Sequence, residues 1–146
     1  MESGPPGRVT RCQVSAASRP ASTAAAVAAQ APVPQAWVWP QLGPLLEHHP
    51  GFPERTNVEF VRVEPDGLTV VVWERGCGLT QACGTGACAA TAAAVLAGRL
   101  APDTWHRVTL PGGPLSIRVP ADLSDVRLRG PVSAVFEGVV PLGPGR

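Results

Sequence analysis

The segment ACAATAAAVLAGRL, at residues 87–100, constrains the fold more than any other part of this sequence. Its alanines and leucines favour helix, Gly98 stands where a C-terminal cap belongs, and Pro102 prevents continuation. We therefore predict a helix from about Thr85 to Ala97. No charged residue occurs from Thr85 to Gly98, so this helix must be buried on nearly all sides.

The rest of the sequence from Asn57 onward has the pattern of β-strands. Runs rich in β-branched and aromatic residues are separated by Pro, Asp and Gly, which form tight turns. We predict a hairpin on each side of the helix and two further strands, namely 57–63 with 68–75, 106–110 with 115–119, then 126–130 and 132–140. The predicted fold class is α+β, a curved antiparallel sheet wrapped around one central apolar helix.

Residues 1–40 differ in composition from residues 41–146. Alanine, serine and proline dominate the first segment, and its prolines disfavour regular structure. We expect 1–40 to be a low-complexity, disordered extension, and 41–146 to form one domain. The scattered arginines and serines of residues 1–40 weakly resemble a transit peptide. We prefer the interpretation that this segment is a poorly ordered or non-native extension. No run of about 18 apolar residues is present to span a membrane.

The charge balance and the missing lysines exclude several functions. Twelve basic and eleven acidic residues give a net charge of +1 without a one-signed block, so we expect a small-molecule partner and neither nucleic acid nor membrane binding. All twelve basic residues are arginines, so the chain cannot form the lysine Schiff base that holds pyridoxal phosphate. We expect no cofactor.

The four cysteines have no C-x-x-C spacing, which argues against a zinc site, and no metal is expected. Free thiols in a reducing cytoplasm are the expectation. Cys88 falls within the alanine-rich helix and is expected in the core, whereas Cys77 lies in a turn and has no assigned role.

Cys83 has a setting that favours reactivity. It precedes Gly84-Thr85-Gly86 at the predicted start of the helix, where unpaired backbone N–H groups and the helix dipole stabilise negative charge. A thiolate is favoured there, and the same N–H groups can hold a carboxylate or phosphate. The alternative is a buried structural thiol.

Glu74 and Arg75 end the strand that leads into this turn. Strand alternation sends their side chains to opposite faces, so one of the two can point at the Cys83 site. Arginine binds carboxylates through two parallel hydrogen bonds. A surface ion pair at the strand end is the alternative.

Four segments together resemble the diaminopimelate epimerase family, matching its conserved motifs in order. They are FPERTNVEFV at 52–61, WERGCGLTQACGTGACA at 73–89, LPGGPLSI at 110–117 and GPVSAVFEG at 130–138. The resemblance implies a cofactor-independent isomerase of lysine biosynthesis, which converts LL-diaminopimelate to meso-diaminopimelate. It also implies two catalytic cysteines, one from each of two similar domains, acting on opposite faces of the α-carbon.

By this resemblance, Cys83 matches the second cysteine of the pair. Glu74 would assist proton transfer as a second catalytic residue. The residues implied to hold the amino and carboxylate groups of the substrate are Asn57, Glu74, Arg75, Gly84 and Thr85.

Two departures from the family pattern qualify this assignment. Leu79 replaces a glutamate of the family motif, and the N-terminal domain with its own cysteine is missing. Cys12, in TRCQVS, has no neighbouring glycines or following helix and cannot stand in for that cysteine. The chain thus resembles the C-terminal half of the enzyme, and we expect weak activity or none when it is alone.

The expected partners are the missing domain, a second chain that supplies the other cysteine, or a second copy in a homodimer. Two alternatives stay open at this point. One is a related cofactor-independent amino-acid racemase or isomerase, and the other is a non-catalytic fragment that binds a carboxylate.

Overall fold

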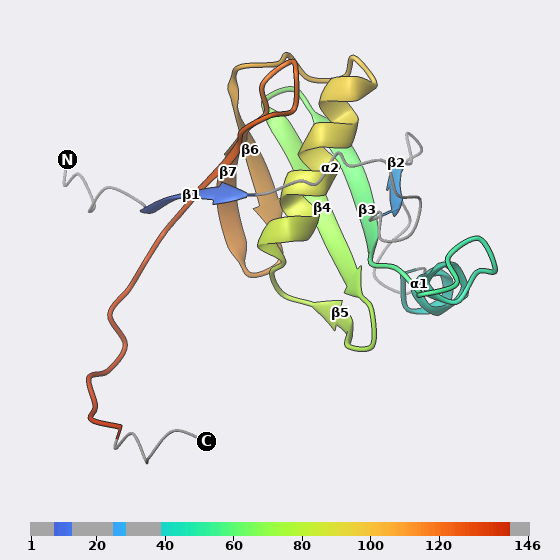
Figure 1. Cartoon of the computed structure of the whole chain (residues 1–146), viewed down its shortest axis with the longest axis horizontal. Coiled ribbons are helices and arrows are strands. Elements are labelled where there is room, and N and C mark those ends of the chain that lie inside the picture. The colour runs from blue at the N-terminus through green and yellow to red at the C-terminus, as the bar shows by residue number, and fades with distance from the viewer. Residues whose placement is uncertain (1–7, 13–24, 29–38, 141–146) are drawn as a thin grey trace.

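A computed structural model describes residues 8–12, 25–28 and 39–140 of the chain (Figure 1). The helices and strands follow the α+β class predicted from the sequence. In chain order they are β1 (Arg8–Cys12), β2 (Ala25–Ala28), α1 (Trp39–Glu47), β3 (Val58–Glu64), β4 (Gly67–Glu74), β5 (Gly78–Thr80), α2 (Gly84–Leu96), β6 (Trp105–Leu110), β7 (Gly113–Arg118) and β8 (Val126–Gly130).

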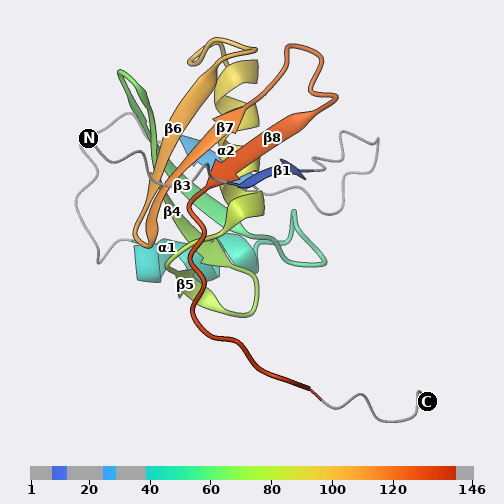
Figure 2. The same cartoon turned by 90° about the vertical axis from the view of Figure 1, so that its left-hand side faces the viewer.

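The strands form one open sheet in the order β1-β8-β7-β6-β4-β3-β2, with β5 paired to the end of β4. Helix α2 lies across one side of this sheet and contacts strands from β8 to β2, so the sheet curves around it (Figures 1 and 2). Both predicted hairpins are present, β3 with β4 and β6 with β7, each in antiparallel register. The prediction of a sheet around a central helix is confirmed.

The sheet is mixed, and the prediction of a wholly antiparallel sheet was wrong in this respect. Strands β4 and β6 are parallel, as are β2 and β3. The reason for the first pair is that β4 and β6 are joined through α2, and a crossover connection through a helix produces parallel neighbours. At the start of this pair the backbones come very close, since a Cβ atom on Gly67 would lie 1.9 Å from the carbonyl oxygen of Arg107.

Helix α2 is the centre of the hydrophobic core, as its uncharged sequence predicts. Ala87, Cys88 and Ala90 are at most 1% exposed and pack against the inward side chains of β4, β6 and β7. Cys88 is therefore a core residue, as expected. The helix ends before Gly98, whose φ of 66° lies in the left-handed region that glycine adopts without strain.

Helix α1 was not predicted from the sequence. It has nine residues, and its two prolines, Pro40 and Pro44, argue against a helix on sequence grounds. Pro40, however, lies in the first turn, where the N–H that proline lacks would have no intrahelical partner. In the described part of the chain, neither helix is long and apolar enough to cross a lipid bilayer.

The strand predicted at 132–140 is not formed. Residues 131–140 leave the body of the fold as an extended segment (Figures 1 and 2). Its apolar side chains, including Val135 and Phe136, are 63–97% exposed. Strand propensity depends on a neighbouring strand to pair with, and this segment lies beside none in the described structure.

Most of residues 1–40, for which we expect disorder, lie outside the described residues. The described exceptions are the strands β1 and β2 and the first two residues of α1. Strand β1 pairs with β8, which places the backbone of Cys12 opposite Val126.

Candidate functional site

Cys83 is the N-cap residue of α2, and the local sequence explains this position. Its extended backbone, with φ of −142°, precedes a helix whose first residues are Gly84, Thr85 and Gly86. The thiol sulfur accepts a hydrogen bond from the backbone N–H of Gly86 at 3.4 Å and lies 3.4 Å from the Thr85 hydroxyl. The cysteine thus occupies the place that serine or aspartate usually takes in a helix cap.

The start of α2 combines a buried cysteine with two exposed residues, Gly84 and Thr85. Cys83 is 8% exposed, whereas Gly84 and Thr85 are exposed. Because the first N–H groups of a helix have no carbonyl partner inside it, those of Gly84 and Thr85 are suited to an anion. The arrangement predicted from the sequence, a thiol next to an anion-binding helix start, is therefore geometrically feasible.

The turn at 110–113 supports the chain segment that enters α2. The N–H of Gly112 donates to the carbonyl oxygen of Gln81 at 2.6 Å, and a Cβ atom on Gly112 would lie 2.8 Å from that oxygen. Only glycine allows this approach without a shift. The LPGG segment therefore fixes the position of the residues just before Cys83.

Asn57 and Arg75 meet at the other side of the turn. The side-chain oxygen of Asn57 accepts a hydrogen bond from the Arg75 N–H at 2.8 Å, and the Arg75 guanidinium donates to the carbonyl oxygen of Glu54 at 3.0 Å. Asn57 thus holds the backbone that follows β4. The Arg75 side chain is exposed and is directed toward the loop before β3.

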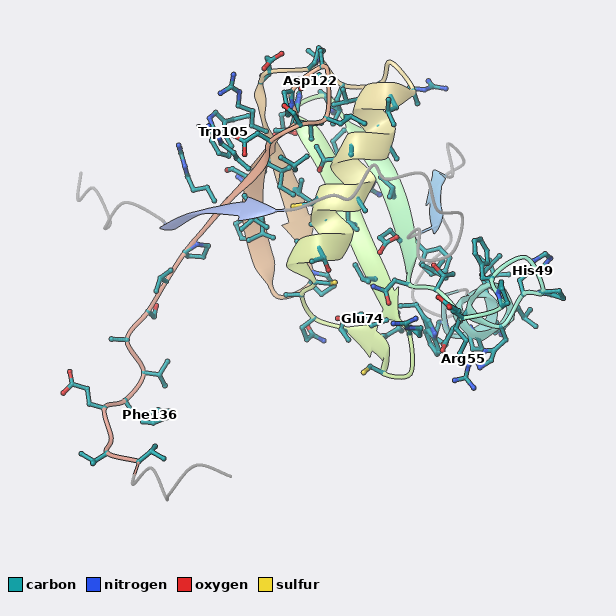
Figure 3. The ribbon with its side chains drawn as sticks, in the orientation of Figure 1. His49, Arg55, Glu74, Trp105, Asp122 and Phe136 are labelled. Atoms are coloured by element: carbon teal, nitrogen blue, oxygen red, sulfur yellow. The ribbon has the colours of Figure 1, made fainter. Side chains whose placement is uncertain are left out.

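Glu74 ends β4 on the side that faces α2. It lies on the same face of β4 as Val70 and Val72, which are fully buried against the helix. Figure 3 shows Glu74 at the end of the fold where α2 begins. The structure therefore brings two groups of predicted site residues to one end of the sheet. One group is Asn57 with Arg75, and the other is Cys83 with Gly84 and Thr85. Glu74, the last residue of β4, lies at the same end.

Leu79, which replaces a glutamate of the family motif, lies on β5 opposite Trp73. Its side chain is 42% exposed.

Sequence reasoning missed two buried acids near the site. Glu47 lies on α1, and Glu59 lies on β3 in line with Val61 and Val63, on the face that packs against α2. The signal for Glu59 was present, since an acid stands at a core-facing position of the alternating run VEFVRV. No comparable signal marked Glu47, because helix α1 was not predicted.

Glu47 ties α1 to the turn after β4. Its carboxylate accepts hydrogen bonds from the Trp73 indole N–H at 2.7 Å and from the Gly76 N–H at 3.0 Å, and the Arg55 guanidinium lies 3.8 Å away. Glu47 is only 3% exposed. The hydrogen bond from Trp73 lowers the pKa of Glu47 in spite of its burial, with smaller contributions from Gly76, His48 and Arg55.

Replacing Glu47 with glutamine is expected to destabilise the fold by about 2 kcal/mol, because the amide places N–H donors against a site built from donors. Urea denaturation at pH 7 measures this. Since the folded-state pKa is below the unfolded one, the carboxylate stabilises the fold above the unfolded value and loses this contribution as pH falls through the folded value. The difference between wild type and Glu47→Gln should therefore shrink at pH 4. The exposed Glu54→Gln variant is the control, and an equal effect of both changes at pH 7 would contradict the assignment.

Within the described residues, no group of three or more His, Cys, Asp or Glu side chains is placed to bind a metal ion.

Comparison with known proteins assigns a family to most of the chain. The family model described as diaminopimelate epimerase matches residues 25–135. Curated proteins named diaminopimelate epimerase from Microcystis aeruginosa and Desulforudis audaxviator are 53% and 57% identical over 102 and 97 residues, which cover 69% and 66% of this chain and 36% and 34% of those proteins. A third, from Synechococcus sp. strain JA-3-3Ab, is 56% identical over 99 residues, or 67% of this chain and 34% of its own length. The chain thus spans about a third of the length of the curated relatives it matches.

Proposed function

Because the chain belongs to the diaminopimelate epimerase family, we propose that it supplies one of the two catalytic thiols for the inversion of LL-diaminopimelate to meso-diaminopimelate. The observation that carries this proposal is Cys83 as the cap of α2, next to the two exposed residues that begin this helix. The other thiol comes from a domain or chain outside these 146 residues. We propose that the reaction needs no cofactor.

In the proposed reaction, one thiolate removes the α-proton while the other thiol delivers a proton to the opposite face. The breaking C–H bond leaves its electron pair on the α-carbon, and the adjacent carboxylate shares the charge. The N–H groups of Gly84 and Thr85 bind that carboxylate and stabilise the charge that develops on it. Cys83 is then the thiolate in one direction and the thiol in the other.

The remaining predicted site residues have supporting roles in this proposal. Arg75 pairs with a substrate carboxylate, and Asn57 holds the backbone of Arg75 in place. Glu74 faces the helix start from β4 and binds the substrate amino group or assists proton transfer. The proposed place of action is the cytoplasm, where thiols stay reduced.

A fusion protein tests this function. The part of the Microcystis aeruginosa enzyme that this chain does not match is joined to residues 42–140, and deuterium uptake at the α-carbon is measured together with formation of meso-diaminopimelate. We expect both in the fusion protein, and weak activity or none for the chain alone. A folded fusion protein that neither exchanges the α-proton nor forms the product would refute the proposal.

Using L-proline in the same assay separates a related racemase from an epimerase of diaminopimelate. The two family segments around Glu74 and Cys83 favour diaminopimelate, so no exchange with proline is expected. Thermal melting of the chain alone with diaminopimelate tests whether this half binds the substrate by itself.

A further inference from the structure

Glu59 is a buried acid that the proposed reaction does not use. Its side chain leaves β3 on the face that packs against α2 and is 0% exposed. Neither carboxylate oxygen has a hydrogen-bond partner on any other described residue. Burying a carboxylate without partners is costly, so a residue kept in this state needs an explanation.

The Glu59 carboxyl group lies at the first turn of α2, beside Cys83. A Cβ atom on Gly86 would be 2.8 Å from the Glu59 Oε1 atom and 3.3 Å from the Cys83 sulfur. The carboxyl group and the thiol thus lie next to the same glycine. In many helices a glutamate at this third position of the helix reaches back to the cap residue. Here glycine leaves the space open, and an acid from the neighbouring strand fills it.

The described groups around Glu59 offer it no positive charge. The charged group that acts on Glu59 is the acid Glu74 on β4, helix α2 has no charged residue, and β2 consists of alanine and valine. The carboxylate of Glu47 on α1 is engaged with Trp73 and Gly76. Burial, with a smaller contribution from Glu74, outweighs a hydrogen bond from the backbone of Glu59 itself and raises the pKa of Glu59 to about 7. The neutral acid is therefore the favoured form up to neutral pH.

We propose that Glu59 is a positioning residue that controls the charge of Cys83. The space around Gly86 accommodates only one negative charge, either on the carboxyl group of Glu59 or on the thiol of Cys83. While Glu59 keeps its proton, Cys83 is free to form the thiolate at the helix start. When Glu59 ionises, its charge opposes the thiolate, since two like charges in a desolvated site disfavour each other. This inference rests on the proposed proton-transfer role of Cys83.

The rate of Cys83 alkylation by iodoacetamide, followed by peptide mass spectrometry from pH 5 to 10, tests the coupling. Only the thiolate reacts, so the rate reports the thiolate fraction at each pH. We expect Glu59→Gln, which removes the competing charge, to lower the pH of half-maximal rate by about one unit. The matched control is Glu64→Gln, because Glu64 lies at the far end of the same strand and bonds to Arg62 and Thr69.

Superimposable alkylation profiles of wild type and Glu59→Gln would overturn the proposal, as would equal shifts in both glutamine variants. A residue that only supports the fold would change the melting temperature without moving the profile. If Glu59→Gln fails to fold, wild type decides the question through an NMR titration of its ¹³C-labelled glutamate side chains. The alkylation profile must then bend at the pH where the Glu59 carbon titrates, and a profile without that bend refutes the coupling.

These measurements need no substrate. If the fusion protein is inactive but Glu59→Gln shifts the alkylation profile of Cys83, the proposed function is refuted and the coupling is supported. If the fusion protein is active but Glu59→Gln leaves the alkylation profile unchanged, the coupling is refuted and the proposed function is supported.

Discussion

Replacing Cys83 with serine in the active fusion protein is expected to lower the rate of α-proton exchange by at least about 1,000-fold, the upper range for removal of a general acid or base. Serine is a preferred N-cap residue and can accept the same hydrogen bond from the Gly86 N–H. The fold should therefore keep its stability while the chemistry is lost. Deuterium incorporation at the α-carbon, measured beside a urea denaturation curve, separates the two effects.

The other cysteines of the domain provide the controls for this variant. Cys77 is exposed in the turn before β5, so Cys77→Ser should leave both activity and stability unchanged. Cys88 is fully buried, so Cys88→Ser should reduce stability and leave proton exchange per folded molecule intact. Activity within about tenfold of wild type in Cys83→Ser would contradict the role of this thiol in proton transfer.

Replacing Gly67 with alanine is expected to cost more than about 4 kcal/mol and to leave little folded protein. The added Cβ atom would lie 1.9 Å from the carbonyl oxygen of Arg107. A backbone oxygen cannot move aside as the end of a side chain can, so β4 and β6 must separate. Their parallel pairing from Gly67 to Thr69 would then be lost, together with the packing of α2 over both strands.

Gly98→Ala is the matched control for the glycine variant. Gly98 has a positive φ of 66°, as Gly67 has one of 155°, but an added Cβ atom on Gly98 would have no other atom within 4 Å. This change should cost only about 1 kcal/mol, the usual penalty for a non-glycine residue in the left-handed region. Urea denaturation of both variants compares them, and equal losses of stability would show that the close approach of β4 to β6 does not matter.

The parts of the fold that the sequence predicted are those with a local or periodic signal. Helix α2 could be placed within one residue at each end, because an uncharged alanine-rich run between glycines favours a buried helix over other secondary structures. The two hairpins followed from alternation and turn residues. Parallel pairing of β4 with β6 joins segments about 40 residues apart in the chain, and no local pattern encodes it.

The errors and omissions have physical causes that can be named. Pro40 lies in the first turn of α1, where proline is compatible with a helix, and Pro44 lies inside the helix, against the rule that proline breaks helices. The run at 132–140 has strand propensity but no neighbouring strand in the described structure. For the candidate site, spacing located Cys83 at a helix start. The contacts of Glu47 and Glu59 depend on tertiary packing, which no motif describes.

The parallel pairing of β4 with β6 also bears on how the domain folds in time. The connection between these strands contains β5, the Cys83 cap and the whole of α2. Closing so long a connection precedes any gain from the contacts it allows, which slows folding relative to a chain with local contacts only. The helix start depends on Gly112 of the β6–β7 turn for its position. The native environment of Cys83 therefore depends on contacts from both sides of the crossover, the pairing of β4 with β6 and the turn between β6 and β7.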